Sequence, residues 1–180
     1  MSQEIDSLLQ QVIDKFVHRL FPALVEPGFV ACPDKHLPAL LDAMTQAVAA
    51  RGVTLELIDL RPAHAELLDG VTERITASNR QPRDPSLPRD RLLVLVGFDL
   101  LEGRKHDEPT YPFRSEFQFD EHHLWLFVGR SRSRLARLFY SYKLPLYRAA
   151  RDLTPDPWSG KRKQSGIAVG TGAGRNSELS

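Results

Sequence analysis

The largest group of side chains that could bind a ligand or partner is a run of basic and aromatic residues near the carboxyl end of the sequence. Seven Arg or Lys residues fall within the 22 positions 130–151, which contain no Asp or Glu. Four aromatic residues are interleaved with them. Guanidinium groups bind carboxylates and phosphates, and aromatic rings stack on bases or on partner side chains. We expect a binding surface formed by Arg130, Arg132, Arg134, Arg137, Lys143, Tyr147 and Arg148.

Three interpretations of this basic segment stay open on the sequence alone. It could be a solvated helix face, it could dock an acidic partner protein or the acidic part of another copy, or it could attract nucleic-acid phosphates. The charge of the whole chain favours a role in recognition, because residues 1–121 have a net charge of −7 and residues 122–180 a net charge of +8, within a formal total of +1. The nearly neutral net charge of the whole chain therefore conceals a strongly basic carboxyl-terminal part.

A second candidate site lies where a nucleotide-binding α/β domain holds its phosphates. Residues 28–51 have the order strand, turn, helix, but the turn contains Pro33, Asp34 and Pro38 and has no glycine. A phosphate loop needs glycines so that backbone N–H groups can close on the anion. We therefore expect a degenerate domain without NTP hydrolysis, in which Lys35 and Asp99 are candidates for the ligand-binding end of the sheet. Asp99 could instead cap the turn after Gly97.

Other reactive side chains predict structure rather than catalysis. Cys32 ends an apolar strand and is expected to be buried, although His36 one turn later would be the base that a thiolate nucleophile requires. The Asp120 to His123 segment offers metal-type ligands, but adjacent side chains of an extended chain point in opposite directions. We expect a solvated edge at this segment, no metal site, no cofactor and no catalytic residues.

Helices and strands alternate along the chain and would position these groups. Helical spacing of apolar residues predicts an amphipathic helix over 3–21 and further helices. The further helices are expected between Asp34 and Gly52, through 66–75 and over 131–142. Apolar runs predict strands at 28–33, 53–59, 92–96 and 124–128. This alternation predicts a three-layer α/β domain with a mostly parallel sheet, resembling a degenerate P-loop NTPase-like domain.

The length of 180 residues suits one domain, which we place at residues 1–152. Residues 153–180 are rich in Gly, Ser and basic side chains and predict a flexible tail. The 13 residues from 78 to 90 include three prolines and predict an exposed loop. With no long apolar run, no signal-like start and a single cysteine, we expect a cytoplasmic protein that does not enter a membrane.

Short motifs in the second half suggest a family. They are an apolar strand ending in Gly97, the segment Tyr111-Pro112-Phe113-Arg114, a strand closing in Gly129, and a Tyr147-Arg148-Ala149 element. Over about residues 90–150 this combination resembles the B component of bacteriophage-exclusion (BREX) defence systems, although the segment between Gly97 and Tyr111 is longer than in the family pattern. The resemblance implies a non-enzymatic accessory or assembly subunit that works with ATPase and methyltransferase-type components.

The sequence thus favours a non-catalytic binding or assembly subunit that docks its partners through the basic segment. A nucleic-acid-binding protein that uses the same Arg and Tyr side chains is the main alternative. A degenerate nucleotide-binding subunit is the third hypothesis. Homo-oligomerisation is compatible with all three.

Overall fold

The computed structural model describes residues 2–20, 26–84, 86–103 and 108–159. Its helices are α1 (Ser2–Leu20), α2 (Leu37–Ala49), α3 (His64–Asn79), α4 (Thr110–Phe117) and α5 (Arg132–Tyr140). Its strands are β1 (Gly28–Ala31), β2 (Thr54–Asp59), β3 (Arg91–Val96), β4 (His123–Gly129) and β5 (Arg151–Asp152). Three short 3₁₀ turns are η1 (Asp34–His36), η2 (Phe98–Leu101) and η3 (Asp156–Ser159).

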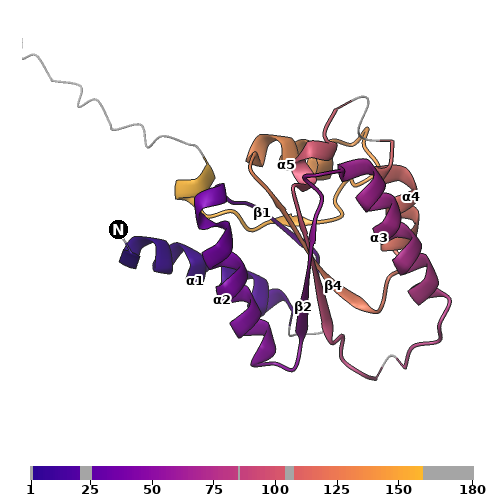
Figure 1. Cartoon of the computed structure of the whole chain (residues 1–180), viewed down its shortest axis with the longest axis horizontal. Helices are drawn as coiled ribbons and strands as arrows, with labels where there is room; N and C mark the ends of the chain where they lie inside the picture. Colours follow the sequence, from indigo (N-terminus) through magenta and orange to yellow (C-terminus); the bar gives the residue numbers. More distant parts are fainter. Residues whose placement is uncertain (1, 21–25, 85, 104–107, 160–180) are drawn as a thin grey trace, which may run out of the picture.

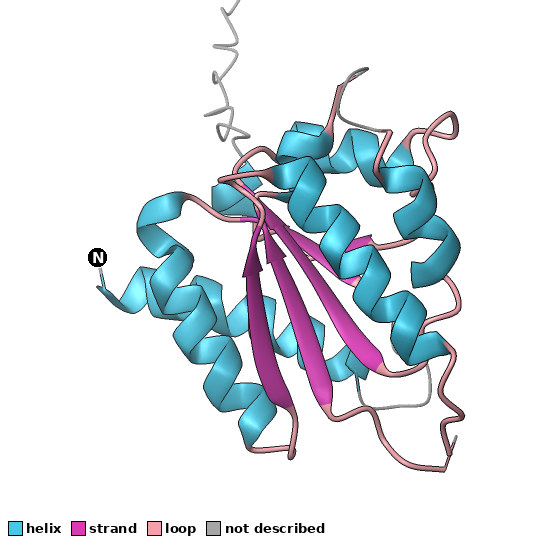
Figure 2. Cartoon of the chain, turned by 45° about the vertical axis from the view of Figure 1, so that its right-hand side comes forward, coloured by secondary structure: helices cyan, strands magenta, loops and turns pink. Residues whose placement is uncertain are grey.

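The strands form one parallel sheet between two layers of helices. The strand order is β2-β3-β4-β1-β5, and every pairing in it is parallel. Helices α1 and α2 cover one face, and α3, α4 and α5 cover the other (Figures 1 and 2). The prediction of a three-layer α/β domain with a parallel sheet is confirmed.

The central strands are apolar on both faces because both faces are covered. In β3, Leu92 and Val94 pack toward α1 and α2, whereas Leu93 and Leu95 pack toward the other helix layer. Strand β4 is divided in the same way, and all seven of its residues are buried. An alternating polar and apolar strand would place polar groups in one of these cores, so the continuous apolar runs are what this layer order requires.

The connections place a crevice beside β1. The chain leaves β1 through α2 and crosses to the far edge at β2, whereas it leaves β4 through α5 and crosses to the opposite edge at β5. The neighbouring strands β1 and β4 therefore send their helices to opposite faces of the sheet. In open α/β sheets a ligand crevice forms at such a point, outside the carboxyl ends of the strands.

The structure differs from the sequence predictions at three places. Helix α4 was not among the predicted helices, and Pro112 lies in its first turn, where its missing N–H leaves no helical hydrogen bond unmade. Strand β5 was not predicted, because two residues carry no periodicity. The boundary predicted at residue 152 falls inside the packed chain, since Leu153 and Thr154 are buried.

Residues after this boundary continue to pack. The Trp158 ring in η3 stacks on His36 with their ring centroids 5.6 Å apart. The flexible tail predicted beyond residue 159 lies outside the described residues. Within the described helices, none has both the length and the apolar character that a membrane crossing requires.

Candidate functional site

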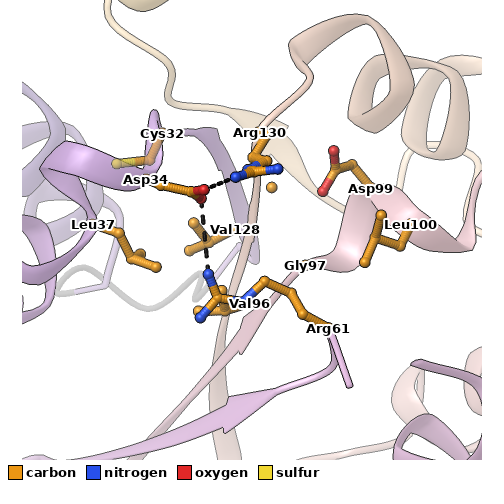
Figure 3. Close-up of a pocket in the computed structure, with 11 residues that line it drawn as sticks. Cys32, Asp34, Leu37, Arg61, Val96, Gly97, Asp99, Leu100, Val128 and Arg130 are labelled. Carbon is orange, nitrogen blue, oxygen red and sulfur yellow. Dashed lines mark hydrogen bonds and ion pairs between the residues drawn. The ribbon is translucent and has the colours of Figure 1, made fainter. Parts of the chain in front are cut away.

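A cavity of about 150 Å³ lies at the carboxyl edge of the sheet, in the crevice between β1 and β4 (Figure 3). We call it the carboxyl-edge cavity. Strands β1 to β4 all end at this cavity. The residues that line it there are Cys32 after β1, Arg61 after β2, Gly97 after β3 and Arg130 after β4. Leu37, Val96, Leu100 and Val128 give it a largely apolar floor.

Asp34 joins two arginines at the mouth of this cavity. Its carboxylate forms an ion pair with Arg130 and a longer one with Arg61, whose Nη1 lies 3.8 Å from Asp34 Oδ1. Arg61 is also held by Asp59, whose Oδ2 is 2.5 Å from Arg61 Nη2, and this hydrogen bond lowers the pKa of Asp59. Two carboxylates of the protein, Asp34 and Asp59, thus neutralise the two guanidinium groups that would otherwise meet an incoming anion.

Asp99 lies deeper in the same cavity and is 3% exposed. Its Oδ2 accepts a hydrogen bond of 3.1 Å from the backbone N–H of Ser131, the residue that caps α5. Asp99 lies at the carboxyl edge of the sheet, where we expected it, and its role in binding a ligand stays a prediction. Asp99 does not cap the turn after Gly97. Its hydrogen bond with the Ser131 N–H instead anchors the start of α5.

Two glycines make this packing possible. Gly97 has a φ of 82°, in the left-handed region, and a Cβ there would lie 2.6 Å from Arg61 Cγ. A Cβ on Gly129 would lie 2.7 Å from Asp99 Cγ. The backbone therefore approaches Arg61 and Asp99 more closely than any other residue type would allow.

Lys35 is separate from this cavity. It is exposed on η1 and is not among the residues that line the cavity, although Asp34 before it is. The pairing of Lys35 with Asp99 as one ligand site is therefore not formed in this structure. The turn after β1 presents Pro33 and the Asp34 carboxylate in place of a glycine-rich backbone, so an anionic phosphate would meet a negative charge.

Cys32 is buried at the end of β1, and burial raises the pKa of its thiol to about 12. The thiol stays protonated at neutral pH, and a protonated thiol is a poor nucleophile. We expect Cys32 in the native protein to react with a thiol reagent at pH 8 at least about 100-fold more slowly than in the unfolded chain. Absorbance on reaction with dithiobis(nitrobenzoic acid), with and without urea, measures this ratio, and equal rates would contradict it.

The arginines of α5 are already engaged with carboxylates of the same chain. Arg132 Nε lies 2.6 Å from Asp152 Oδ2, and both Arg134 and Arg137 pair with Glu102 at 3.3 and 3.1 Å. These pairs connect α5 to β5 and to the residue after η2. A binding role for Arg130, Arg132, Arg134 and Arg137 stays a prediction, but their charges are partly neutralised by the fold.

The residues after α5 differ in this respect. Within the described part of the chain, Lys143 and Arg148 form no ion pair with a carboxylate. The Lys143 ammonium lies 5.6 Å from the centroid of the Tyr142 ring, and the Arg148 guanidinium lies 5.0 Å from that of Tyr147. We call Tyr142, Lys143, Tyr147 and Arg148 the post-helix surface.

The segment predicted as a solvated edge before β4 is instead partly buried. The Asp120 carboxylate accepts a hydrogen bond of 2.7 Å from Trp125 Nε1, and its Oδ1 lies 3.0 Å from His123 Nδ1. Asp120 and His123 are 6% exposed each, so the prediction of a solvated edge is wrong for both. In the described residues, no group of three His, Cys, Asp or Glu side chains converges as metal ligands would.

Several basic residues at the two edges were missed by the sequence reasoning. Arg61 reaches the carboxyl-edge cavity, and Arg89 and Arg114 line a cavity at the opposite edge together with Arg148. Arg61 and Arg114 stand apart from other basic residues, and Arg89 lies at the end of the segment predicted as an exposed loop, so no local pattern reveals a binding role for them. The signal that could have found Arg61 is its place directly after a predicted strand, where ligand-binding groups of α/β domains lie.

The comparisons with known proteins add little to this geometry. No protein-family model matches the sequence, and neither does any curated protein. A solved structure of the Aeropyrum pernix ORC2 protein, in ADPNP-ADP complexes, is similar with a TM-score of 0.43 and 12% sequence identity. The similar region covers 84% of this chain and 47% of that one, so this chain spans about half its length.

Proposed function

We propose that this protein is a non-catalytic binding subunit of a multiprotein complex and that it docks an acidic protein partner through the post-helix surface. The observation that carries the proposal is the state of the basic groups there. Lys143 and Arg148 lack carboxylate partners in the described residues, whereas the arginines of α5 have them. Charge that the fold does not neutralise is available to a partner of opposite charge.

The composition of the surface suits protein docking. Tyr142 is 75% exposed and the neighbouring Tyr140 is 49% exposed. Tyr and Arg dominate the energetics of protein interfaces, because they supply large contact area together with hydrogen-bonding groups. Exposed aromatic rings with cations over them fit a partner that covers both.

Three features of the carboxyl-edge cavity support the non-catalytic part of the proposal. Asp99 is committed to the N–H that begins α5, and the high pKa of Cys32 keeps its thiol protonated. The cavity volume of about 150 Å³ is also below the several hundred Å³ of typical ligand pockets, which disfavours a whole nucleotide. These observations favour a binding subunit over the nucleotide-binding hypothesis.

The resemblance of residues 90–150 to the B component of BREX systems supports a defence complex as the setting. On that basis the acidic partner would be an ATPase or methyltransferase-type subunit of the same system. DNA binding through the same residues is the competing interpretation, and the experiment below separates the two.

The test uses the full chain co-expressed with the proteins encoded beside it. We expect the double variant Tyr142→Ala with Lys143→Glu to weaken capture of the partner at least about tenfold while the protein stays folded, because both side chains are exposed. Lys35→Glu, the same charge reversal on η1, is the matched control and should bind like the wild type.

The competing outcomes are distinct. Capture of the partner by the double variant at wild-type strength would contradict the docking surface. The proposal would be replaced by nucleic-acid binding if the wild type captured no protein but bound duplex DNA with a steep dependence on salt, and if the double variant lost that DNA binding.

A further inference from the structure

Three arginines from separate segments line one cavity of about 300 Å³ at the edge where the parallel strands begin. We call it the arginine cavity. Arg89 precedes β3, Arg114 lies on α4, and Arg148 precedes β5. The carboxyl-edge cavity lies at the other ends of the same strands, so the two sites are separate.

None of these three guanidinium groups forms an ion pair with a carboxylate in the described chain. Asp120 is the acidic residue in the cavity lining, but its oxygens accept hydrogen bonds from His123, Trp125 and the backbone N–H of His122. The lining therefore has three cations and one carboxylate that is already engaged, a formal charge of +2.

Arg89 is held in this cavity at a cost. Its Nη1 donates a hydrogen bond of 3.1 Å to the carbonyl oxygen of His123, and its burial lowers the pKa of the guanidinium despite the attraction of Asp120. A cation that is partly removed from water and has no ion-pair partner is less stable than one that has an anion beside it. An anion in the cavity would remove this cost.

Arg148 is also held in an unfavourable state. Its φ is 57°, and among the described residues it alone outside glycine has a positive φ. Its backbone N–H donates to the carbonyl oxygen of Phe139 at 2.7 Å, which fixes this conformation. An arginine in the left-handed region, where glycine would be less strained, indicates that its side chain has a use at that position.

The arginine cavity also joins two motifs whose arginines are 34 positions apart in the sequence. Arg114 belongs to the Tyr-Pro-Phe-Arg segment and Arg148 to the Tyr-Arg-Ala segment, both of which stand out in the sequence. The fold brings both arginines to one cavity, together with Ala149. These motifs therefore meet at a site that the docking surface does not account for.

We propose that the arginine cavity binds a dianionic phosphoryl group, carried by inorganic phosphate or by a small phosphomonoester. Two negative charges match the formal charge of the lining, and guanidinium groups recognise phosphate oxygens by paired hydrogen bonds. The volume, at the lower end of the range for small-molecule pockets, accommodates a phosphate with a small organic group. The site does not rest on the docking proposal, although Arg148 belongs to both surfaces.

The test is calorimetric titration of the full chain with inorganic phosphate and with phenyl phosphate, at constant ionic strength set by chloride. We expect binding of at least one ligand, together with a rise in Tm as the ligand concentration increases. Tighter binding of phenyl phosphate assigns the site to a phosphomonoester, and equal or weaker binding assigns it to free phosphate. Binding of neither ligand would overturn the proposal.

Variants locate the site. Arg114→Gln should weaken binding at least about tenfold, because a charge-assisted hydrogen-bonding group is lost. Arg148→Gly should do the same while the Tm without ligand is unchanged or higher, since glycine relieves the left-handed conformation and a loss of binding then cannot come from misfolding. Arg130→Gln, at the carboxyl-edge cavity, is the control. Unchanged binding by Arg114→Gln, or a loss caused by Arg130→Gln instead, would contradict this location.

Discussion

Replacing Asp120 with alanine should lower the free energy of unfolding by about 3–5 kcal/mol, because it leaves buried hydrogen-bonding groups without a partner. The Asp120 side chain is fully buried and accepts hydrogen bonds from Trp125 Nε1 and from the backbone N–H of His122, with His123 Nδ1 beside it. Urea unfolding at pH 7 measures the loss. Since a domain of this size is stable by about 5–15 kcal/mol, the variant would lose a large share of its stability.

The matched control is Asp69→Ala, which removes an exposed carboxylate on α3. It should leave the free energy of unfolding nearly unchanged. If Asp120→Ala were as stable as this control, the buried hydrogen bonds of Asp120 would not stabilise the fold.

The pH dependence of the same variant gives a second check. Burial alone would raise the pKa of Asp120. The hydrogen bond and charge of His123, together with the hydrogen bonds from Trp125 and from the backbone N–H of His122, outweigh burial and lower this pKa. A lowered pKa in the folded state means that this stabilisation is complete above the ordinary carboxyl pKa of about 3.9 and disappears as the pH falls through the folded value. The stability difference between wild type and Asp120→Ala should therefore narrow only below about pH 4.

Replacing Gly129 with alanine should destabilise the protein by about 1–3 kcal/mol through overpacking. The new Cβ would lie 2.7 Å from Asp99 Cγ and 2.8 Å from Asp99 Cβ, so the whole Asp99 side chain must shift, not only its flexible end. That shift breaks the hydrogen bond from Ser131 and loosens the start of α5. Urea unfolding gives the loss of stability.

Gly70→Ala is the matched control, because it is the same substitution in a different environment. A Cβ at Gly70 meets nothing within 4 Å, and the residue lies inside α3. Alanine there should raise the free energy of unfolding by about 0.5–1 kcal/mol, since it restricts the unfolded chain and favours the helix. An equal effect of the two substitutions would contradict the close contact between Gly129 and Asp99.

The sequence was informative wherever a segment is long and its apolar pattern is regular. The runs at 92–96 and 124–128 predicted strands that are buried on both faces, and β3 and β4 are such strands. It was not informative where tertiary contacts decide. Helix α4 is eight residues long and contains Pro112, and nothing local shows that it packs under the sheet.

The candidate site shows the same division. The place of Asp99 after a central strand could be predicted, because ligand-binding groups of α/β domains cluster there. Its contact with Ser131 could not, since the two residues are 32 positions apart and meet only through the order of the strands. The burial of Asp120 was likewise hidden, because its neighbours Glu121 and His122 are polar and exposed or half-buried.

The interior position of β1 in the sheet has a consequence for the synthesis of the protein on the ribosome. β1 hydrogen-bonds to β4 on one side and to β5 on the other, and both follow it by roughly 100 residues or more. At synthesis rates of about 5–20 residues per second, the nascent strand waits on the order of 5–20 s for its first partner. Before β2 and β3 have been made, the apolar side chains of α1, β1 and α2 have no sheet to cover, so this early segment is where chaperone capture or misassembly of the nascent chain would begin.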